Sequence, residues 1–163
     1  MANIYIFGII SFLHNLFSAI WIGGLIALAL TVMPSVIKVM GKTPEARKLL
    51  NQIKKRLSVL VYISIFVLLV TGLLLSKHST VYGGFSFASN TYTTLLTVKH
   101  ILYALMIIIA LVRSFILERL KLDSNVEQKL SAGLLFANVV FGIVVLLLSG
   151  LTTALAQAAL ASP

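Results

Sequence analysis

Four long runs of apolar residues constrain this chain more than any other feature of its sequence. They cover roughly residues 5–37, 57–76, 93–117 and 130–161, and the stretches between them are polar. A helix that rises 1.5 Å per residue needs about 20 apolar residues to cross the hydrocarbon core of a bilayer. Each run reaches that length. The sequence therefore predicts an all-α integral membrane protein, a four-helix bundle that forms a single domain over residues 1–163.

The composition agrees with this prediction. Hydrophobic residues make up 60% of the 163 residues, whereas soluble domains contain about 45–50% apolar residues. We interpret the first run as a retained helix, because no Lys or Arg precedes it and it is longer than the apolar region of a signal peptide. The chain has no cysteine, which excludes disulfides, thiolate metal sites and iron–sulfur clusters.

The positive charge is distributed unevenly along the chain. The formal net charge is +9, and seven Lys and Arg residues lie between positions 38 and 56, while the connection 77–92 carries only Lys77. Cytoplasmic loops of membrane proteins are enriched in Lys and Arg. We therefore expect residues 38–56 in the cytoplasm, near anionic lipid head groups rather than nucleic acid. Both termini would then lie outside, in a multi-pass protein of a prokaryotic cell membrane.

Local signals refine these helices. Thr43, Pro44 and Glu45 match an N-cap, a first helical position and an acidic first turn, so the second helix should begin near residue 44 and enter the membrane near Leu57. Residues 121–129 are expected to form a short polar turn. Small residues in the first and fourth runs predict close helix packing, either within the bundle or in a homodimer.

Few ionisable residues lie inside the apolar runs. The four acidic residues occupy the connections or their edges: Glu45, Glu118, Asp123 and Glu127. Proton relays and cation pathways usually need membrane carboxylates, so a proton-driven transporter is disfavoured. The ionisable residues that remain within the runs are His14, Lys99 and His100, with Arg113 toward the cytoplasmic end.

The two histidines fall at matched depths. His14 lies nine residues after Tyr5, and His100 lies seven residues after Thr93, which places them about 13 Å and 11 Å along their helices. The first and third helices run in the same direction, so both imidazoles can face each other in the outer half of the membrane. Such a pair suits the axial ligation of a haem. The alternative is that each histidine bonds a carbonyl or hydroxyl group of a neighbouring helix.

Other side chains extend this candidate site. Ser18 and Trp21 share the helix face of His14, where small residues leave room for a porphyrin and aromatic residues pack on it. Lys99 either snorkels to the outer interface or pairs with an anion such as a haem propionate or an anionic substrate. His78, just beyond the second run, is either a solvated loop residue or a ligand of copper, zinc or haem.

The sequence resembles the CopD-like (copper resistance D) membrane proteins over nearly its whole length. The matching motifs are His14 followed by Trp21, Gly23, Gly24 and Pro34, then Thr71-Gly72, then Lys99 with Arg113, then Gly142. Two positions depart from the family pattern. Asn138 stands where the fourth helix of the family often carries an acid, and His100 directly after the lysine is not a general family feature. The resemblance implies copper handling, whereas His100 favours haem.

The chain is also similar to HemJ-type protoporphyrinogen oxidases and to small four-helix b-type cytochromes. His14, Trp21 and Lys99 match the HemJ-type pattern, which implies haem b. The basic, histidine-containing segment that ends the first helix of those oxidases is replaced by residues 33–36, Met-Pro-Ser-Val. This replacement weighs against porphyrinogen oxidation.

The leading hypothesis is a haem b-binding membrane protein that transfers electrons. It is left open whether the protein is also a membrane oxidoreductase that turns over a substrate. His14 and His100 would be the axial ligands, Lys99 a propionate or substrate partner, and Ser18, Trp21 and Tyr103 the pocket. The redox partner is left open between a quinone, an oxygen species and a protein. The alternatives are copper uptake or resistance along His14, His78 and Met106, and a HemJ-like oxidase.

Overall fold

The computed structural model describes residues 2–78, 91–116 and 124–161, and no strand occurs among them. The elements are α1 (Ala2–Ala27), π-helix η1 (Leu28–Val32), α2 (Met33–Met40), α3 (Pro44–His78), α4 (Thr91–Leu111), π-helix η2 (Val112–Ile116) and α5 (Ser124–Ala161). Four stretches are long and apolar enough to cross a membrane: Ile4–Met40, Pro44–Leu75, Thr91–Ser114 and Val126–Ala158. The predicted all-α fold with four spans is confirmed, and the chain is a multi-pass membrane protein.

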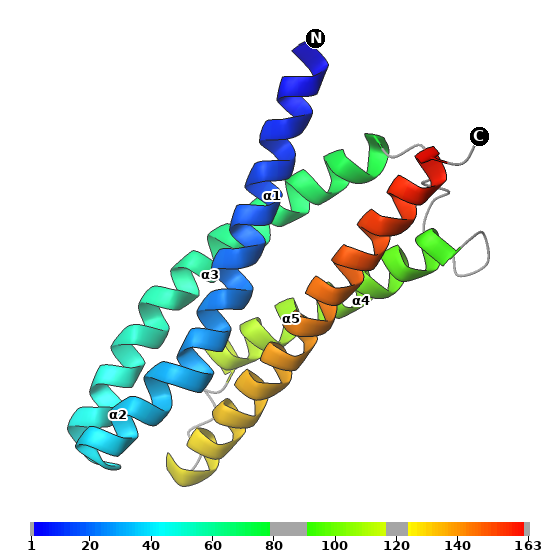
Figure 1. Ribbon diagram of the computed structural model, residues 1–163. Helices are drawn as coiled ribbons and strands as arrows, with labels where there is room; N and C mark the ends of the chain where they lie inside the picture. Colours follow the sequence, from blue (N-terminus) through cyan, green and yellow to red (C-terminus); the bar gives the residue numbers. More distant parts are fainter. Residues whose placement is uncertain (1, 79–90, 117–123, 162–163) are drawn as a thin grey trace.

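The helices form an elongated bundle in which α1 packs mainly on α3 and α4 packs mainly on α5 (Figure 1). Contacts between α1 and α5 join the two pairs. Both chain termini lie at one end of the bundle, which we call the terminal end (Figure 1). The opposite end, formed by α2 and the starts of α3 and α5, is called the basic end.

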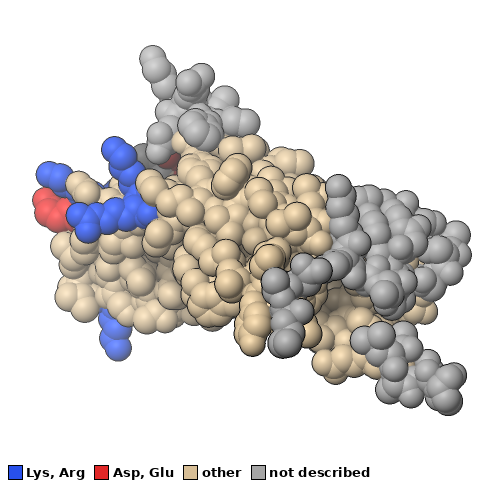
Figure 2. All heavy atoms as spheres, turned by 90° about the horizontal axis from the view of Figure 1, so that it is seen from above, with Lys and Arg blue, Asp and Glu red and all other residues tan. Residues whose placement is uncertain are grey.

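Charge and apolar surface are separated on this bundle. Figure 2 shows the visible Lys and Arg side chains, together with acidic ones, gathered toward one side of the molecule, while the described surface away from that side is uncharged in this view. Large apolar side chains such as Phe12, Phe66 and Leu147 are more than half exposed. In a membrane-spanning helix such residues face lipid, because the bilayer core is as apolar as they are.

The core runs along the centre of the bundle. It contains Trp21, Ile22, Leu25 and Leu28 from the first helix, Val61 and Leu68 from α3, Met106 from α4, and Leu135 and Val139 from α5. Gly142 lets α5 approach this core, since a Cβ atom there would lie 3.0 Å from Ile22 Cγ2. Gly24 is similarly tight, at 2.8 Å from Leu57 Cδ1, whereas Gly8, Gly23, Gly133 and Gly150 face open space. Only part of the small-residue pattern therefore serves packing within this chain.

Pro34 explains the irregular end of the first membrane helix. Proline lacks an N–H group, and its ring clashes with the carbonyl four residues earlier. The preceding turn is a π-helix, in which the Met33 N–H donates to the Leu28 carbonyl oxygen, five residues earlier, rather than to the carbonyl oxygen four residues earlier as in an α-helix. The helix then continues as α2 to Gly41, whose φ of 66° reverses the chain.

The predicted start of α3 is confirmed. The Ala46 N–H donates to Thr43 Oγ1 at 3.2 Å, and the Arg47 N–H donates to the Thr43 carbonyl oxygen at 3.1 Å. The prediction for residues 121–129 is wrong in part, because α5 already begins at Ser124. Ser124 with Glu127 three residues later is the pattern of a capping box, and this signal extends the helix into the expected turn.

Candidate functional site

His14 lies on α1 and is partly buried against α3. Its Nδ1 atom is 2.9 Å from Thr71 Oγ1, and the Thr71 hydroxyl donates to the Val67 carbonyl oxygen at 2.7 Å. A hydroxyl has one proton and a carbonyl oxygen only accepts. With the Thr71 hydroxyl turned toward Val67, the Nδ1–H of His14 is assigned as the donor to Thr71 Oγ1. In this tautomer the neutral His14 ring carries its lone pair on Nε2.

His100 lies on α4 and reaches the same tautomer through a different partner. Its Nδ1 atom is 2.7 Å from the carbonyl oxygen of Leu96, one turn earlier in the helix. Because a carbonyl oxygen cannot donate, Nδ1 carries the proton, and the neutral ring has its lone pair on Nε2. Histidines that bind metals commonly donate their other ring N–H to a carbonyl, a carboxylate or water, which fixes the ring orientation. His100 has this arrangement, and His14 has a similar one in which a threonine hydroxyl takes the place of the carbonyl group.

The structure brings the ionisable residues of the terminal half together. Lys99 and His100 on α4 are both close enough to act electrostatically on His14 of α1. All three side chains are partly buried. Gly72 of α3 lies beside His14, since a Cβ atom there would be in ordinary van der Waals contact with the His14 Cε1 atom, at 3.5 Å.

Trp21 and Tyr103, predicted as pocket residues, contact each other. Trp21 is 1% exposed, and the two rings meet edge to face with their centroids 5.2 Å apart. The Tyr103 hydroxyl donates to the Ile65 carbonyl oxygen at 2.9 Å, which ties α4 to α3. The Ser18 hydroxyl donates to the His14 carbonyl oxygen at 2.8 Å. Ser18 therefore lies beside His14 but bonds its backbone rather than its imidazole.

The remaining candidates lie apart from this group. His78 is the last residue of α3, and its side chain lies outside the described residues, as does the connection 79–90. Met106 is 1% exposed and packs in the core, where its carbonyl oxygen accepts from Asn138 Nδ2 at 3.4 Å. Among the residues that the structure describes, no group of three or more His, Cys, Asp or Glu side chains is placed to hold a metal ion.

Thr71 is the residue whose role sequence reasoning missed. It was noticed as part of a motif, but its hydrogen bond to His14 connects residues 57 positions apart. A threonine inside an apolar helix usually bonds a carbonyl of its own helix, and its oxygen can still accept a second hydrogen bond. The sequence signal that could have indicated this contact is a threonine within one apolar helix at about the same membrane depth as a histidine in another.

Comparisons of the chain with known protein families, with curated proteins and with solved structures found no match. The likeness to CopD-like and HemJ-type proteins rests on the motif residues alone and stays a prediction. The function must accordingly be argued from the arrangement of His14, His100 and Lys99.

Proposed function

We propose that this protein binds one haem b between α1 and α4 and transfers electrons in the membrane. The observation that carries the proposal is the hydrogen bond that His14 and His100 each make through Nδ1. Each ring holds Nδ1 within 2.9 Å of an oxygen of the protein, so that Nε2, the atom an axial ligand would use, points away from that oxygen. The two residues lie near each other on two different helices.

The donor set suits a haem better than a bare metal ion. The porphyrin itself supplies four ligands to its iron, so two imidazoles complete the coordination. Thr71 and the Leu96 carbonyl group would hold the two rings and increase their basicity. The contact between Trp21 and Tyr103 would form an apolar wall toward the bundle centre, where water is excluded.

Lys99 provides a positive charge that can pair with a carboxylate of the cofactor. It follows directly before His100 in the sequence and acts electrostatically on His14. A cation at membrane depth is costly unless an anion accompanies it. In this proposal the Lys99 ammonium group binds a propionate, so that it orients the cofactor without ligating the iron.

A bound haem supplies one-electron chemistry. The residues of the chain orient it, neutralise its carboxylate and keep water from the iron. With two histidine ligands the iron would exchange electrons readily and would bind oxygen or carbon monoxide poorly. The redox partner in this proposal is a membrane quinone or a partner protein.

An absorption spectrum of protein produced in a haem-replete host tests this function. The wild-type protein should show a low-spin haem b spectrum, and His14→Ala and His100→Ala should each abolish it while the helical circular dichroism persists. His78→Ala is the matched control and should keep the spectrum. Unchanged spectra in both single variants would contradict this ligand pair. A colourless wild-type protein that binds copper stoichiometrically would favour copper handling instead.

We further propose that the basic end is cytoplasmic and that both termini lie outside, in a prokaryotic cell membrane. Lys and Arg are concentrated at the basic end, as the positive-inside rule requires. The chain lacks cysteine, so single cysteines can report this orientation. Ile4→Cys should react with an impermeant thiol reagent on intact cells, and Thr43→Cys should react only after permeabilisation. The reverse pattern would invert the topology.

A further inference from the structure

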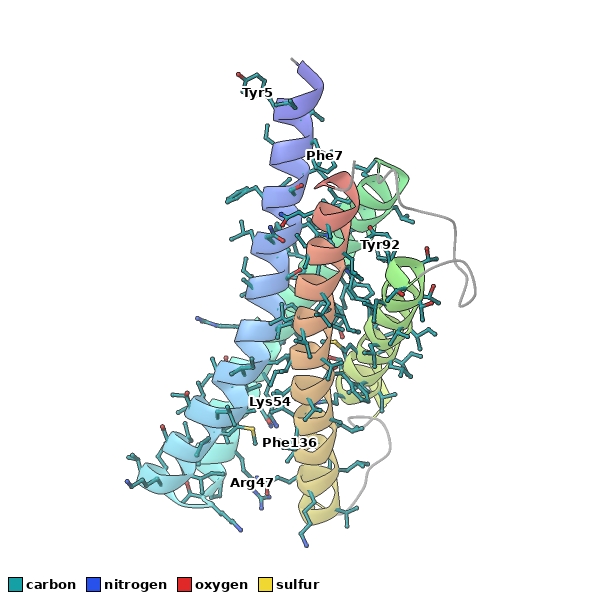
Figure 3. All side chains as sticks on the ribbon, turned by 45° about the vertical axis from the view of Figure 1, so that its right-hand side comes forward. Tyr5, Phe7, Arg47, Lys54, Tyr92 and Phe136 are labelled. Carbon is teal, nitrogen blue, oxygen red and sulfur yellow. The ribbon has the colours of Figure 1, made fainter. Side chains whose placement is uncertain are left out.

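A cavity of about 900 Å³ opens toward the basic end and reaches the core of the bundle, with lining residues from α1, η1, α3, α4, η2 and α5. Its apolar wall includes Trp21, Leu25, Leu28, Val61 and Ala110. Its charged wall carries five cationic side chains and one carboxylate: Arg47, Lys48, Lys54, Lys55, Arg113 and Glu127. Figure 3 shows Arg47 and Lys54 extending from α3 into the space beside α5.

The charges that border the cavity are unbalanced. Lys54 lies close enough to Arg113 and Glu127 to interact electrostatically with both. Apart from Arg47, four of the described lining residues are cationic (Lys48, Lys54, Lys55 and Arg113), whereas Glu127 is the one carboxylate among them. Like charges that share a partly desolvated space repel each other unless an anion joins them. The lining therefore fits a ligand that carries negative charge.

Buried polar atoms on the same lining point to the same conclusion. Within the described part of the chain, Trp21 Nε1, Arg113 Nε and Asn138 Oδ1 are buried and have no hydrogen-bond partner. All three residues line the cavity. Two of these atoms are N–H donors, so they call for acceptor oxygens. Buried polar groups of this kind are normally satisfied by protein, by ordered water or by a ligand.

Both π-helices contribute to this cavity. Leu28 belongs to η1, and Arg113 and Ser114 belong to η2. Single π-turns within α-helices occur frequently at functional sites. The irregular turns of two different membrane helices thus meet at one cavity, and the η2 turn carries one of its cations, Arg113.

We infer that this cavity binds the phosphate head group of an anionic phospholipid, with Arg113 and Lys54 as its main contacts. The acyl chain would lie along the apolar wall formed by Trp21, Leu25 and Val61. An amphiphile fits better than a free anion because the lining is charged on one side and apolar on the other. Basic pockets between membrane helices on the cytoplasmic side are known to bind such head groups. This inference does not depend on haem binding.

Native mass spectrometry of the purified protein with added lipid tests the inference. Short-chain phosphatidylglycerol is the probe, phosphatidylcholine is the zwitterionic control, and inorganic phosphate is the competitor. The wild-type protein should bind one phosphatidylglycerol molecule in preference to phosphatidylcholine. Arg113→Gln and Lys54→Gln should each weaken that binding roughly tenfold or more, because a charge-assisted hydrogen bond is lost.

Lys42→Gln is the matched control, because Lys42 is exposed in the turn after α2 and is not part of the cavity lining. It should leave phosphatidylglycerol binding unchanged. Equal weakening by Lys42→Gln and Lys54→Gln would mean that the surface charge binds the lipid, and it would overturn the cavity site. Displacement of the lipid by millimolar inorganic phosphate would identify a free anion as the ligand and would overturn the lipid assignment. Lys54→Gln keeps the test decisive if Arg113→Gln fails to fold.

Discussion

In the terminal half, His14 and His100 each hold Nδ1 at hydrogen-bond distance from an oxygen of the protein. In the cavity that opens toward the basic end, Arg113 Nε and Trp21 Nε1 have no such partner among the described residues. A buried polar group without a partner costs about 1–3 kcal/mol. Hydrogen bonds within the protein therefore hold the His14 and His100 rings of the terminal half in one orientation. The basic end keeps buried donors that a bound anion would satisfy.

The largest expected effect concerns the partner that orients His14. Thr71→Val removes the acceptor of the Nδ1 proton and leaves that proton unsatisfied in a partly buried site. Loss of such an outer partner typically reduces metal affinity by about 10–100-fold. Haem occupancy, titrated by absorbance after reconstitution, should fall accordingly.

Thr152→Val provides the control for that experiment. Thr152 is also buried and also donates to the carbonyl oxygen four residues earlier, but no histidine side chain that the structure describes bonds it. Haem occupancy should be unaffected. Equal losses of haem in the two variants would show that both threonine hydroxyls contribute only to the stability of the protein. Thr71 would then have no specific role in orienting His14.

The next effect tests whether the two ends share one packed core. Gly142→Ala places a Cβ atom 3.0 Å from Ile22 Cγ2 and 3.4 Å from Met106 Cε, and overpacking of this kind costs about 1–3 kcal/mol. The thermal unfolding temperature in detergent should fall. Gly133→Ala, on the same helix but facing open space, should leave it unchanged or raise it. Equal unfolding temperatures for the two variants would mean that α5 does not pack against Ile22 at Gly142.

A smaller effect concerns the start of α3 at the basic end, which Thr43 caps. Thr43→Ala removes the Oγ1 atom that accepts from the Ala46 N–H. Loss of a threonine N-cap costs about 1 kcal/mol, and the unfolding temperature should drop slightly. Thr43→Ser keeps the oxygen and should restore the stability. If Ser and Ala behave alike, the cap contributes nothing to the start of α3.

The smallest expected effect concerns Lys99. Removal of its positive charge in Lys99→Met favours the oxidised iron, so the midpoint potential should fall by roughly 20–60 mV, equivalent to a screened interaction of about 0.5–1.4 kcal/mol. Lys99→Arg keeps the charge and should keep the potential. Spectroelectrochemical titration measures both. Complete loss of haem in Lys99→Met would make Lys99 essential for binding rather than a modulator of the potential.

Hydropathy and cap signals were sufficient to predict the four spans and the start of α3 at Pro44. They could not predict the helix rotations, because the helices are apolar on the lipid-facing side as well as on the core side. For the same reason the partner of His14, which lies on another helix, was not evident from its own sequence neighbours. The early start of α5 was legible in Ser124 and Glu127 but was overlooked among polar residues.

The cavity at the basic end was hidden for a related reason. Its charged residues were read as an orientation signal, since Lys54 and Lys55 belong to a run of basic residues. Their joint presence with Arg113 and Asn138 depends on three helices that meet only in the folded chain. The sequence gives the number of these charges, but it does not show that their side chains line one cavity.

The π-turn from Leu28 to Val32 has a consequence for the rotational phase of the first membrane helix. It accommodates one residue more than a regular turn, and each added residue rotates everything beyond it by about 100°. The rotation of α1, which carries His14 and Trp21 on one face, is therefore independent of the rotation of α2 about its axis. A one-residue deletion in this turn would swing Lys38 to another side of the helix and leave His14 in place. The chain can thus vary the surface at one membrane face without disturbing the residues near the other.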